Sequence, residues 1–283
     1  MKNKRTAVRL CGALLGIGGL WVAMTQQPPA QDLTVEKVAD DLHVIVGSGG
    51  NVAVYTTDDG VILVDDKFER NVPAILEKVK SLSSKPIRYV LNTHHHGDHS
   101  GGNQLLMKDA EIVAHKNARA NMVKTSQPGQ PRLSFADEFA VNFGGKEVRA
   151  RHFGAGHTNG DAVIYFPAHK TVHTGDLFVR GTPFIDYGNG GSSEAWMKTI
   201  DGILTLDFDT VIPGHGAISK RADLVKWKAD YQTVRSRVKE MVQQGKSKDD
   251  VARSLKVDDL TGWSLSGLLV KSIPGLYDEM SKR

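Results

Sequence analysis

The chain has 283 residues, of which 40% are hydrophobic, 24% charged and 7% aromatic, and these proportions exclude a collagen-like, disulfide-rich or wholly disordered protein. Its formal net charge is +4, but four Lys and Arg residues among the first nine supply the whole excess, because residues 1–30 contain no Asp or Glu. Residues 31–283 are therefore neutral overall and show no basic stripe, so we expect no nucleic-acid partner.

The first thirty residues are typical of an export signal. Basic residues up to Arg9 precede an apolar stretch at 10–24, and small and polar residues follow it. About 15 apolar residues are short for a membrane span, so we expect a signal peptide, with an uncleaved N-terminal anchor as the alternative. Cys11, the only cysteine, lies inside this stretch, so the mature chain has no thiol, which suits an oxidising compartment. We therefore expect a periplasmic or secreted protein.

Beyond residue 30, short β-rich runs alternate with amphipathic segments. We expect strands at 35–46, 52–57, 61–64, 87–91, 112–114, 147–152, 162–166, 171–173 and 210–212. We expect helices at 73–82, 103–108, 118–125, 193–204 and 221–244. This interleaving is typical of an α/β or α+β fold in which helices cover the sheets.

After Gly216 the sequence changes character. Residues 221–283 have a wholly helical pattern, with breaks expected at Gly245, Gly262 and Pro274. A segment of this length makes a marginal independent domain, so we expect a helical extension packed on the core. The predicted organisation is a signal or anchor at 1–30, a main domain at 31–220 and the extension at 221–283.

The histidines are arranged like metal ligands. The strand expected at 87–91 runs into the sequence THHHGDH, in which alternation places His94 and His96 on the same side of an extended backbone. Asp98 and His99 follow a glycine, where the turning chain can aim them at a second, adjacent cation. Imidazole and carboxylate ligands suit zinc or iron. This density of ligand-type residues after a buried strand favours a metal site over a solvated histidine cluster.

Three later segments repeat the order of strand end, glycine and ligand-type residue. They are GHT around His157, TGD ending at Asp176 and PGHG around His215. A small residue lets the backbone approach closely behind a ligand, and each ligand lies on a loop at a strand end. A single Gly-His pair carries little information, but the segments together predict a metal centre assembled from distant parts of the chain.

On the motif THHHGDHSGG at 93–102, followed in order by these three segments, the chain resembles the metallo-β-lactamase superfamily over roughly residues 35–218. The resemblance implies an α+β four-layer αββα sandwich, with the catalytic domain at 31–220 and two Zn²⁺ ions at one edge between the sheets, iron or manganese being possible instead. It implies one metal held by His94, His96 and His157, a second held by Asp98, His99 and His215, and a bridging Asp176.

The bridging residue indicates the branch of the superfamily. Many zinc β-lactamases that resemble this motif have Cys or Ser at this position, whereas Asp176 resembles the glyoxalase II, lactonase and RNA-processing branches. An Asp here does not forbid β-lactam hydrolysis. The export signal and the absence of a basic surface argue against RNA processing, and the extension lacks a recognisable glutathione-binding pattern.

The resemblance predicts an exported dinuclear zinc hydrolase with Asp98 as its catalytic residue. A metal-bridging hydroxide, oriented by Asp98, would cleave a small-molecule carbonyl ester, lactone, thioester or amide, β-lactams included. The alternative is a mononuclear iron sulfur (persulfide) dioxygenase of the same superfamily, against which the second ligand set argues. A non-catalytic metal-binding module is a third hypothesis, disfavoured by the complete ligand set. The oligomeric state is left open.

Two loops are expected to recognise the substrate. The segment 178–193 contains Phe184 and Tyr187, and Tyr187 is predicted to donate a hydrogen bond to an oxyanion or leaving group, the alternative being a packed surface loop. The turn at 47–51 is the expected opposing wall. Three residues beside the ligands are expected either to orient them or to serve local structure only, and they are Thr93, Thr158 and Asp161. Structural or surface roles are expected for the other histidines, namely His43, His95, His115, His152, His169 and His173.

Overall fold

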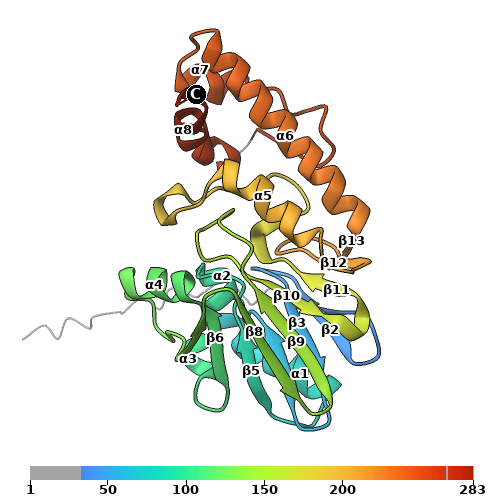
Figure 1. Cartoon of the computed structure of the whole chain (residues 1–283). Coiled ribbons are helices and arrows are strands. Elements are labelled where there is room, and N and C mark those ends of the chain that lie inside the picture. The colour runs from blue at the N-terminus through green and yellow to red at the C-terminus, as the bar shows by residue number, and fades with distance from the viewer. Residues whose placement is uncertain (1–32, 266, 283) are drawn as a thin grey trace, which may run out of the picture.

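The computed structural model describes residues 33–265 and 267–282 (Figure 1). The export signal expected at 1–30 lies outside the described residues. Within those ranges, none of the helices combines the length and the apolar character needed to cross a membrane.

Two mixed β-sheets form the centre of the molecule. The first has seven strands in chain order, antiparallel from β1 to β4 and parallel from β4 to β7. Its strands are β1 (Thr34–Lys37), β2 (Leu42–Val46), β3 (Val52–Thr56), β4 (Val61–Val64), β5 (Ile87–Leu91), β6 (Glu111–His115) and β7 (Leu133–Phe135).

The second sheet has six strands in the order β13-β12-β11-β10-β9-β8. Only the β11–β12 pair is parallel among these described strands. The strands are β8 (Glu138–Phe143), β9 (Lys146–Arg151), β10 (Val163–Phe166), β11 (Thr171–His173), β12 (Thr210–Ile212) and β13 (Ser219–Lys220).

The two sheets pack face to face, and alternation along each strand explains how both faces are buried. In β4, Ile62 and Val64 join the core between the sheets, together with Ile164 and Phe166 of β10. Val61 and Leu63 point to the opposite face, where they meet helix α1. A strand covered on both sides has a continuous apolar sequence, which is why VILV contains no polar residue.

Helices cover the outer face of each sheet and give the four layers. The first sheet carries α1 (Val72–Leu82), with the short helices α2 (Gly97–Ser100), α3 (Asn103–Leu106) and α4 (Lys116–Lys124) near its edge. The second sheet carries α5 (Ser193–Ile203) and α6 (Arg221–Gln243), whose Trp196 and Trp227 pack in one cluster with Val172 and Val211. Helices α7 (Lys248–Ser254) and α8 (Gly267–Ser281) pack beside one end of α6 (Figure 1). The predicted αββα sandwich is confirmed.

Some strand predictions were wrong in detail. The run expected at 35–46 is two strands, because the chain turns between them, where the amides of Val38 and Ala39 both donate to the carbonyl of Leu42 at 2.9 Å. Strands β7 and β8 were not predicted at all. Both lie at sheet edges, where much of each strand is exposed. Strand β7 has only three residues, whereas β8 does alternate, with Phe139, Val141 and Phe143 at every second position, and this signal was overlooked.

The C-terminal extension is less uniformly helical than predicted. No helix forms among the described residues between Ser254 and Gly267, and the chain turns there around Gly262. Pro274 does not interrupt the helix, contrary to the prediction, but lies inside α8. A proline inside a helix costs about 3 kcal/mol. Burial of Ile273 and Leu276 on either side of Pro274 offsets this cost, so the helix continues through it.

Candidate metal centre

The ligand-type residues predicted from the sequence meet at one edge of the sandwich. Each lies just beyond the end of a strand or in the loop that follows it, so the parallel β4–β7 region and the second sheet deliver their loops to the same place. The segment after β5 brings His94, His96, Asp98 and His99; the loop after β9 brings His157; and the ends of β11 and β12 bring Asp176 and His215.

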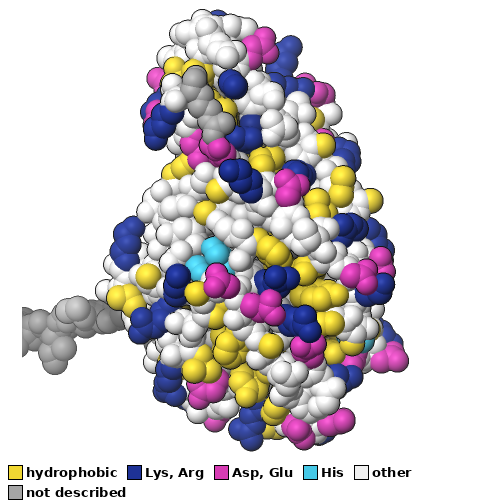
Figure 2. Space-filling model, in the orientation of Figure 1, with side chains coloured by type: hydrophobic (Ala, Val, Ile, Leu, Met, Phe, Trp, Pro, Cys, Tyr) yellow, Lys and Arg dark blue, Asp and Glu magenta, His cyan; other side chains and the backbone are white. Residues whose placement is uncertain are grey.

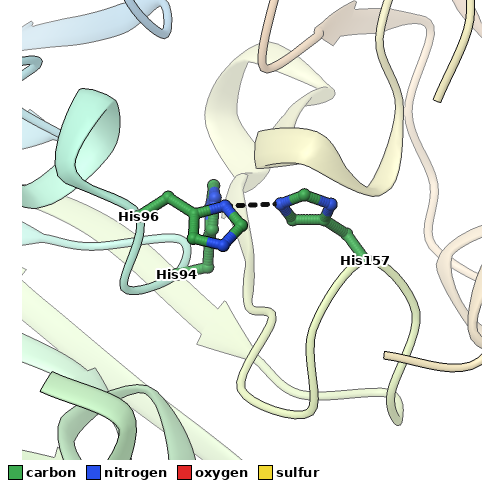
Figure 3. Close-up of side chains that lie close together, drawn as sticks. All are labelled: His94, His96 and His157. Atoms are coloured by element: carbon green, nitrogen blue, oxygen red, sulfur yellow. Dashed lines mark hydrogen bonds between the residues drawn. The ribbon is translucent and has the colours of Figure 1, made fainter. Parts of the chain in front are cut away.

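The first group consists of His94, His96 and His157, each of which has a ring nitrogen within 4.8 Å of the others'. His94 and His96 come from one segment, and His157 faces them from the opposite loop (Figure 3). The Nδ1 atom of His96 lies 2.8 Å from the Nε2 atom of His157.

Hydrogen bonds on the far side of each ring fix which nitrogen carries the proton. His157 Nδ1 lies 2.7 Å from the carbonyl oxygen of Phe184, and His96 Nε2 lies 2.8 Å from the carboxylate of Asp186, so both of these nitrogens must donate. The Thr93 hydroxyl donates to Asp65 at 2.7 Å and therefore accepts from His94 Nδ1 at 3.1 Å.

In their neutral forms the three rings therefore present only lone pairs to one another. His94 Nε2 has no hydrogen-bond partner among the described residues. Facing lone pairs at 2.8 Å repel unless a cation lies between them or a proton is added. This arrangement fits a metal ion with three imidazole ligands, which is the ligand number of catalytic zinc sites with an open position.

The second group consists of Asp98, His99 and His215, again with ligand atoms within 4.8 Å. His99 donates through Nδ1 to Asp65 at 2.8 Å, so in the neutral form of the ring its Nε2 lone pair faces His215 Nε2, which lies 3.2 Å away. The Oδ2 atom of Asp98 lies 3.3 Å from His215 Nε2. Acceptor atoms again converge on one point, here with a carboxylate among them, which fits a second cation.

Asp176 lies between the two groups. Its Oδ1 atom is 3.1 Å from His99 Nε2 and 3.3 Å from His215 Nε2, while its Oδ2 atom is 3.7 Å from His157 Nε2. One carboxylate oxygen thus faces each group. This placement fits the bridging role that the resemblance implied.

The two groups differ in their electrostatics. Burial lowers the pKa of His94 well below its ordinary value and lowers that of His157 to about 4, so both rings stay neutral at neutral pH. Burial also acts against protonation of His99 and His215, but nearby carboxylates, chiefly Asp176, outweigh it. They raise the pKa of His99 well above its ordinary value and that of His215 to about 9.

The turn at 47–51 supports the second group from the first sheet. The amide of Gly50 donates to the Asp98 carbonyl at 2.9 Å, and its carbonyl accepts from the ammonium of Lys67 at 2.6 Å. A Cβ atom at Gly50 would lie 2.2 Å from Cε1 of His99, so only glycine fits there. The side chain of Asn51 donates to the carbonyls of Pro213 and Gly216, on either side of His215, at 2.9 and 2.8 Å.

The loop at 178–193 supports the first group from the opposite side. Phe184 and Asp186 fix the rings of His157 and His96, as described above, and the amide of Asp186 donates to the His157 carbonyl at 2.9 Å. Asp186 also accepts from the amide and the side chain of Asn189 at 3.1 and 2.7 Å. The carboxylate is therefore held in place before it meets the imidazole.

The structure separates the residues that were expected to assist the ligands. Of the two roles left open for Thr93, the structure favours the first, because its hydroxyl contacts the His94 ring. The hydroxyl of Thr158 donates to Asp161 at 2.6 Å, so this pair closes the turn after His157 and contacts no ligand ring. His173 has the predicted structural role, because its Nε2 donates to the carbonyl of Asn51 at 3.1 Å.

Tyr187 is not brought to the ligands. Its ring packs on Gly275 of α8, where a Cβ atom would lie 2.2 Å from the ring, and its hydroxyl donates to Glu279 at 3.0 Å. Glu279 also accepts from Ser192 at 2.7 Å, and from both the amide and the hydroxyl of Ser193. We therefore do not retain Tyr187 as a substrate contact. Its position ties the loop at 178–193 to the last helix.

Sequence reasoning missed Lys67 and Asp186. Lys67 is fully buried, which is rare for lysine, and its partner is a backbone carbonyl seventeen positions away in sequence. Asp186 accepts a hydrogen bond from His96, which lies ninety positions earlier in the sequence. Neither residue has a local sequence pattern that could have identified it.

A cavity of about 300 Å³ opens over the two groups. Histidine side chains, coloured cyan, reach the surface near the middle of the face shown in Figure 2, below the C-terminal helices. The residues that line the cavity are His96, Asp98, His157, Asp176, Val179, Arg180, Thr182, Phe184, His215 and Leu268. Five of the seven predicted ligands thus face solvent-accessible space where a small molecule fits, and Tyr187 is not among these lining residues.

Comparisons with known proteins identify the family of the chain. Residues 45–215 match the family model described as the metallo-beta-lactamase superfamily. A metallo-beta-lactamase type 2 from Bacillus cereus is 28% identical over 80% of this chain and 97% of its own. A hydroxyacylglutathione hydrolase from Crocosphaera subtropica is 34% identical over 40% of this chain and 43% of its own. The solved structure of a metallo-beta-lactamase from Pontibacter korlensis aligns with a TM-score of 0.64 at 20% identity, covering 71% of this chain and 99% of that one.

Proposed function

The chain belongs to the metallo-beta-lactamase superfamily and is a metal-dependent hydrolase, and on this basis we propose that it is an exported dinuclear zinc hydrolase of small carbonyl compounds. The observation that carries the proposal is the pair of ligand groups, His94, His96 and His157 beside Asp98, His99 and His215, with Asp176 between them. Both groups direct lone pairs inward, and both border the same cavity. The ester, lactone, thioester and amide classes all present the carbonyl that such a site attacks.

Two bound cations would supply Lewis acidity, which makes hydroxide available at neutral pH and polarises a carbonyl oxygen. The residues of this chain supply the rest. Burial raises the pKa of Asp98, but the neighbouring His215 and His99 rings hold it below its ordinary value. The carboxylate is thus ionised and borders the cavity, so it can orient an attacking water and accept its proton.

The supporting residues keep the ligands in place during the reaction. Asp65 receives hydrogen bonds from Thr93 and from His99, so one buried carboxylate orients a ring in each group. Phe184 and Val179 give the cavity apolar walls beside the ligands, which limits the water that reaches the reacting carbonyl. Arg180 is the cation among the described lining residues and is placed to attract an anionic part of a substrate.

The first experiment is the metal content of the mature chain, purified without added metal or an affinity tag and measured by mass spectrometry. We expect about two zinc ions per chain, followed by turnover in a screen of lactones, thioesters and β-lactams. One iron per chain with little zinc, together with oxygen uptake on persulfides, would replace the proposal with the sulfur dioxygenase alternative.

Export rests on the N-terminal sequence, with its basic start and its apolar stretch at 10–24. Cell fractionation followed by N-terminal sequencing tests it. We expect the chain in the periplasmic or extracellular fraction. Recovery of the intact chain from the cytoplasm would contradict export without affecting the hydrolase.

A further inference from the structure

The first turn of α8 reaches the cavity above the metal ligands. Leu268 lines this cavity together with His96, His157 and Phe184. It is 52% exposed, whereas the next core-facing residues of the same helix, Leu269 and Ile273, are fully buried. Leu268 therefore contributes little to packing within the described residues. A large apolar side chain that is exposed beside a binding cavity is available to a ligand.

The cavity is lined by both apolar and charged side chains. Val179, Phe184 and Leu268 supply apolar side chains, and the Phe184 ring lies 5.8 Å from the ring of His157. Arg180 and Asp98 supply charge, and Arg180 pairs with Asp223 at 3.1 Å. The site is thus suited to a molecule with a hydrophobic group attached to the reacting carbonyl.

The position of Leu268 is set by contacts on both sides of it. Before it, the amide of Ser264 donates to the Thr182 hydroxyl at 2.7 Å, and that hydroxyl donates back to the Ser264 carbonyl at 3.2 Å. After it, the Ser272 hydroxyl accepts from the amide of Ile185 at 2.9 Å. These contacts hold α8 against the loop at 178–193, which carries Phe184. Leu268 and Phe184 are therefore held on the same cavity.

We propose that Leu268 is a specificity-determining residue, which with Val179 and Phe184 selects carbonyl compounds that carry an alkyl or aryl substituent over their small acetyl-like counterparts. The inference rests on the proposed function and adds the substrate class. Leu268 lies beyond residues 45–215, the part that matches the family, so its share of this selection comes from the C-terminal helices, whereas Val179 and Phe184 lie within the matched part.

The test uses binding to the zinc-loaded full-length mature protein, so that it does not depend on knowing the natural substrate. Acetohydroxamate and octanohydroxamate serve as probes, because both offer the same metal-binding group and differ only in their alkyl chains. Calorimetry gives the ratio of their dissociation constants. One well-buried methylene group changes affinity by roughly tenfold at the lower end of the range for apolar pockets.

We expect the wild type to bind octanohydroxamate at least about tenfold more tightly than acetohydroxamate. Leu268→Ala and Leu268→Ser should reduce that preference by about fivefold or more and leave acetohydroxamate binding unchanged. Leu268→Met should retain the preference. Leu76→Ala is the matched control, because Leu76 is an exposed leucine on α1, at 45% exposure, outside the cavity lining.

Two outcomes would overturn the inference, and they are distinguishable. If the variants keep two zinc ions and an unchanged melting temperature but show the wild-type preference, Leu268 does not select substrates, and the proposed hydrolase stands. If the wild type binds neither hydroxamate and holds no zinc, the proposed function fails, and the substrate class fails with it.

Discussion

The two ligand groups lie side by side, yet they are held in different ways. His94, His96 and His157 form a group without a carboxylate, in which His94 and His157 are buried and His96 is partly exposed. Acceptors behind the rings fix them, at Thr93, Asp186 and Phe184. The second group contains a carboxylate and has raised histidine pKa values. It is supported by the turn at 47–51, which joins β2 and β3 of the first sheet, whereas the loop at 178–193, which supports the first group, follows β11 of the second sheet.

This difference indicates that geometry organises the first group and charge organises the second. In the first group the buried rings of His94 and His157 need no proton release at neutral pH before a cation binds, since both are neutral there. In the second group a cation must replace protons on His99 and His215. The two groups should therefore be separable by substitutions that touch only one support.

The largest effect is expected from the ligands themselves. His96→Ala and Asp98→Ala each remove a ligand atom from one group, and both should lower kcat/KM by more than about 100-fold, beyond the usual effect of a supporting residue. Circular dichroism should show an unchanged fold, because both residues lie beyond β5, His96 directly before the short helix α2 and Asp98 in it, and neither is part of the hydrophobic core. Hydrolysis at the wild-type rate by either variant would contradict the proposed mechanism.

The next largest effect is expected from the buried charge of Lys67. Burial lowers the pKa of Lys67 to about 8, although Asp65 and Asp98 act in the opposite direction. Between pH 8 and 10.5 the unfolded chain holds more protons at this lysine than the folded one, so its contribution to stability rises with pH across that window. The rise amounts to about 3 kcal/mol, from a shift of roughly 2.5 pH units.

Urea unfolding of wild type and Lys67→Met at pH 8, 9 and 10, with the same metal loading, measures this contribution. The difference between the two proteins should change in favour of the wild type as pH rises. Lys85→Met is the control, because Lys85 also donates to backbone carbonyls, at Thr57 and Asp58, but is exposed. A pH-independent difference between wild type and Lys67→Met would contradict the lowered pKa of Lys67.

A smaller effect is expected when the support of the first group is removed. Asp186→Ala frees the Nε2 side of the His96 ring and should lower affinity for the first metal by about 10–100-fold. The second metal should be retained. Zinc titration against a chelating dye, which separates a tight from a weakened site, reports both values. An equal loss of affinity for both metals would contradict the proposal that Asp186 supports only the first group.

The smallest effect is expected when a support of the second group is removed. Asn51→Ala removes the two hydrogen bonds to the carbonyls that flank His215. Affinity for the second metal should fall by about tenfold, the lower end for a supporting residue, because His99 and Asp98 keep their own contacts. The same dye titration applies, and loss of the first metal instead of the second would reverse the assignment.

The convergence of the proposed ligands could be predicted from the sequence because each of them has a local sequence signal. His94 and His96 alternate after an apolar strand, and His157 and His215 each follow a glycine that allows close approach. The layers were predictable for a similar reason, since strands buried on both faces have uninterrupted apolar sequences. The supports were not predictable, because Lys67 and Asp186 act across long sequence separations.

Packing also overrode local signals where the chain departs from the sequence prediction. Pro274 carries a strong helix-breaking signal, but α8 is stabilised by side chains buried against α5 and α6. The hydroxyl of Tyr187 meets Glu279 instead of the cavity for the same reason, because the extension covers that side of the loop. In both cases a contact with a distant helix decides the outcome, and no local pattern records it.

The contacts of Glu279 have a consequence for the order in which the protein matures. Glu279 follows Tyr187 by 92 positions in sequence, yet it fastens Tyr187, Ser192 and Ser193, which belong to the loop that orients the first ligand group. A ribosome needs roughly 5–20 s to synthesise such a stretch. During that interval the loop exists without the carboxylate that locks it, so a nascent chain that stalls there remains without a finished active site.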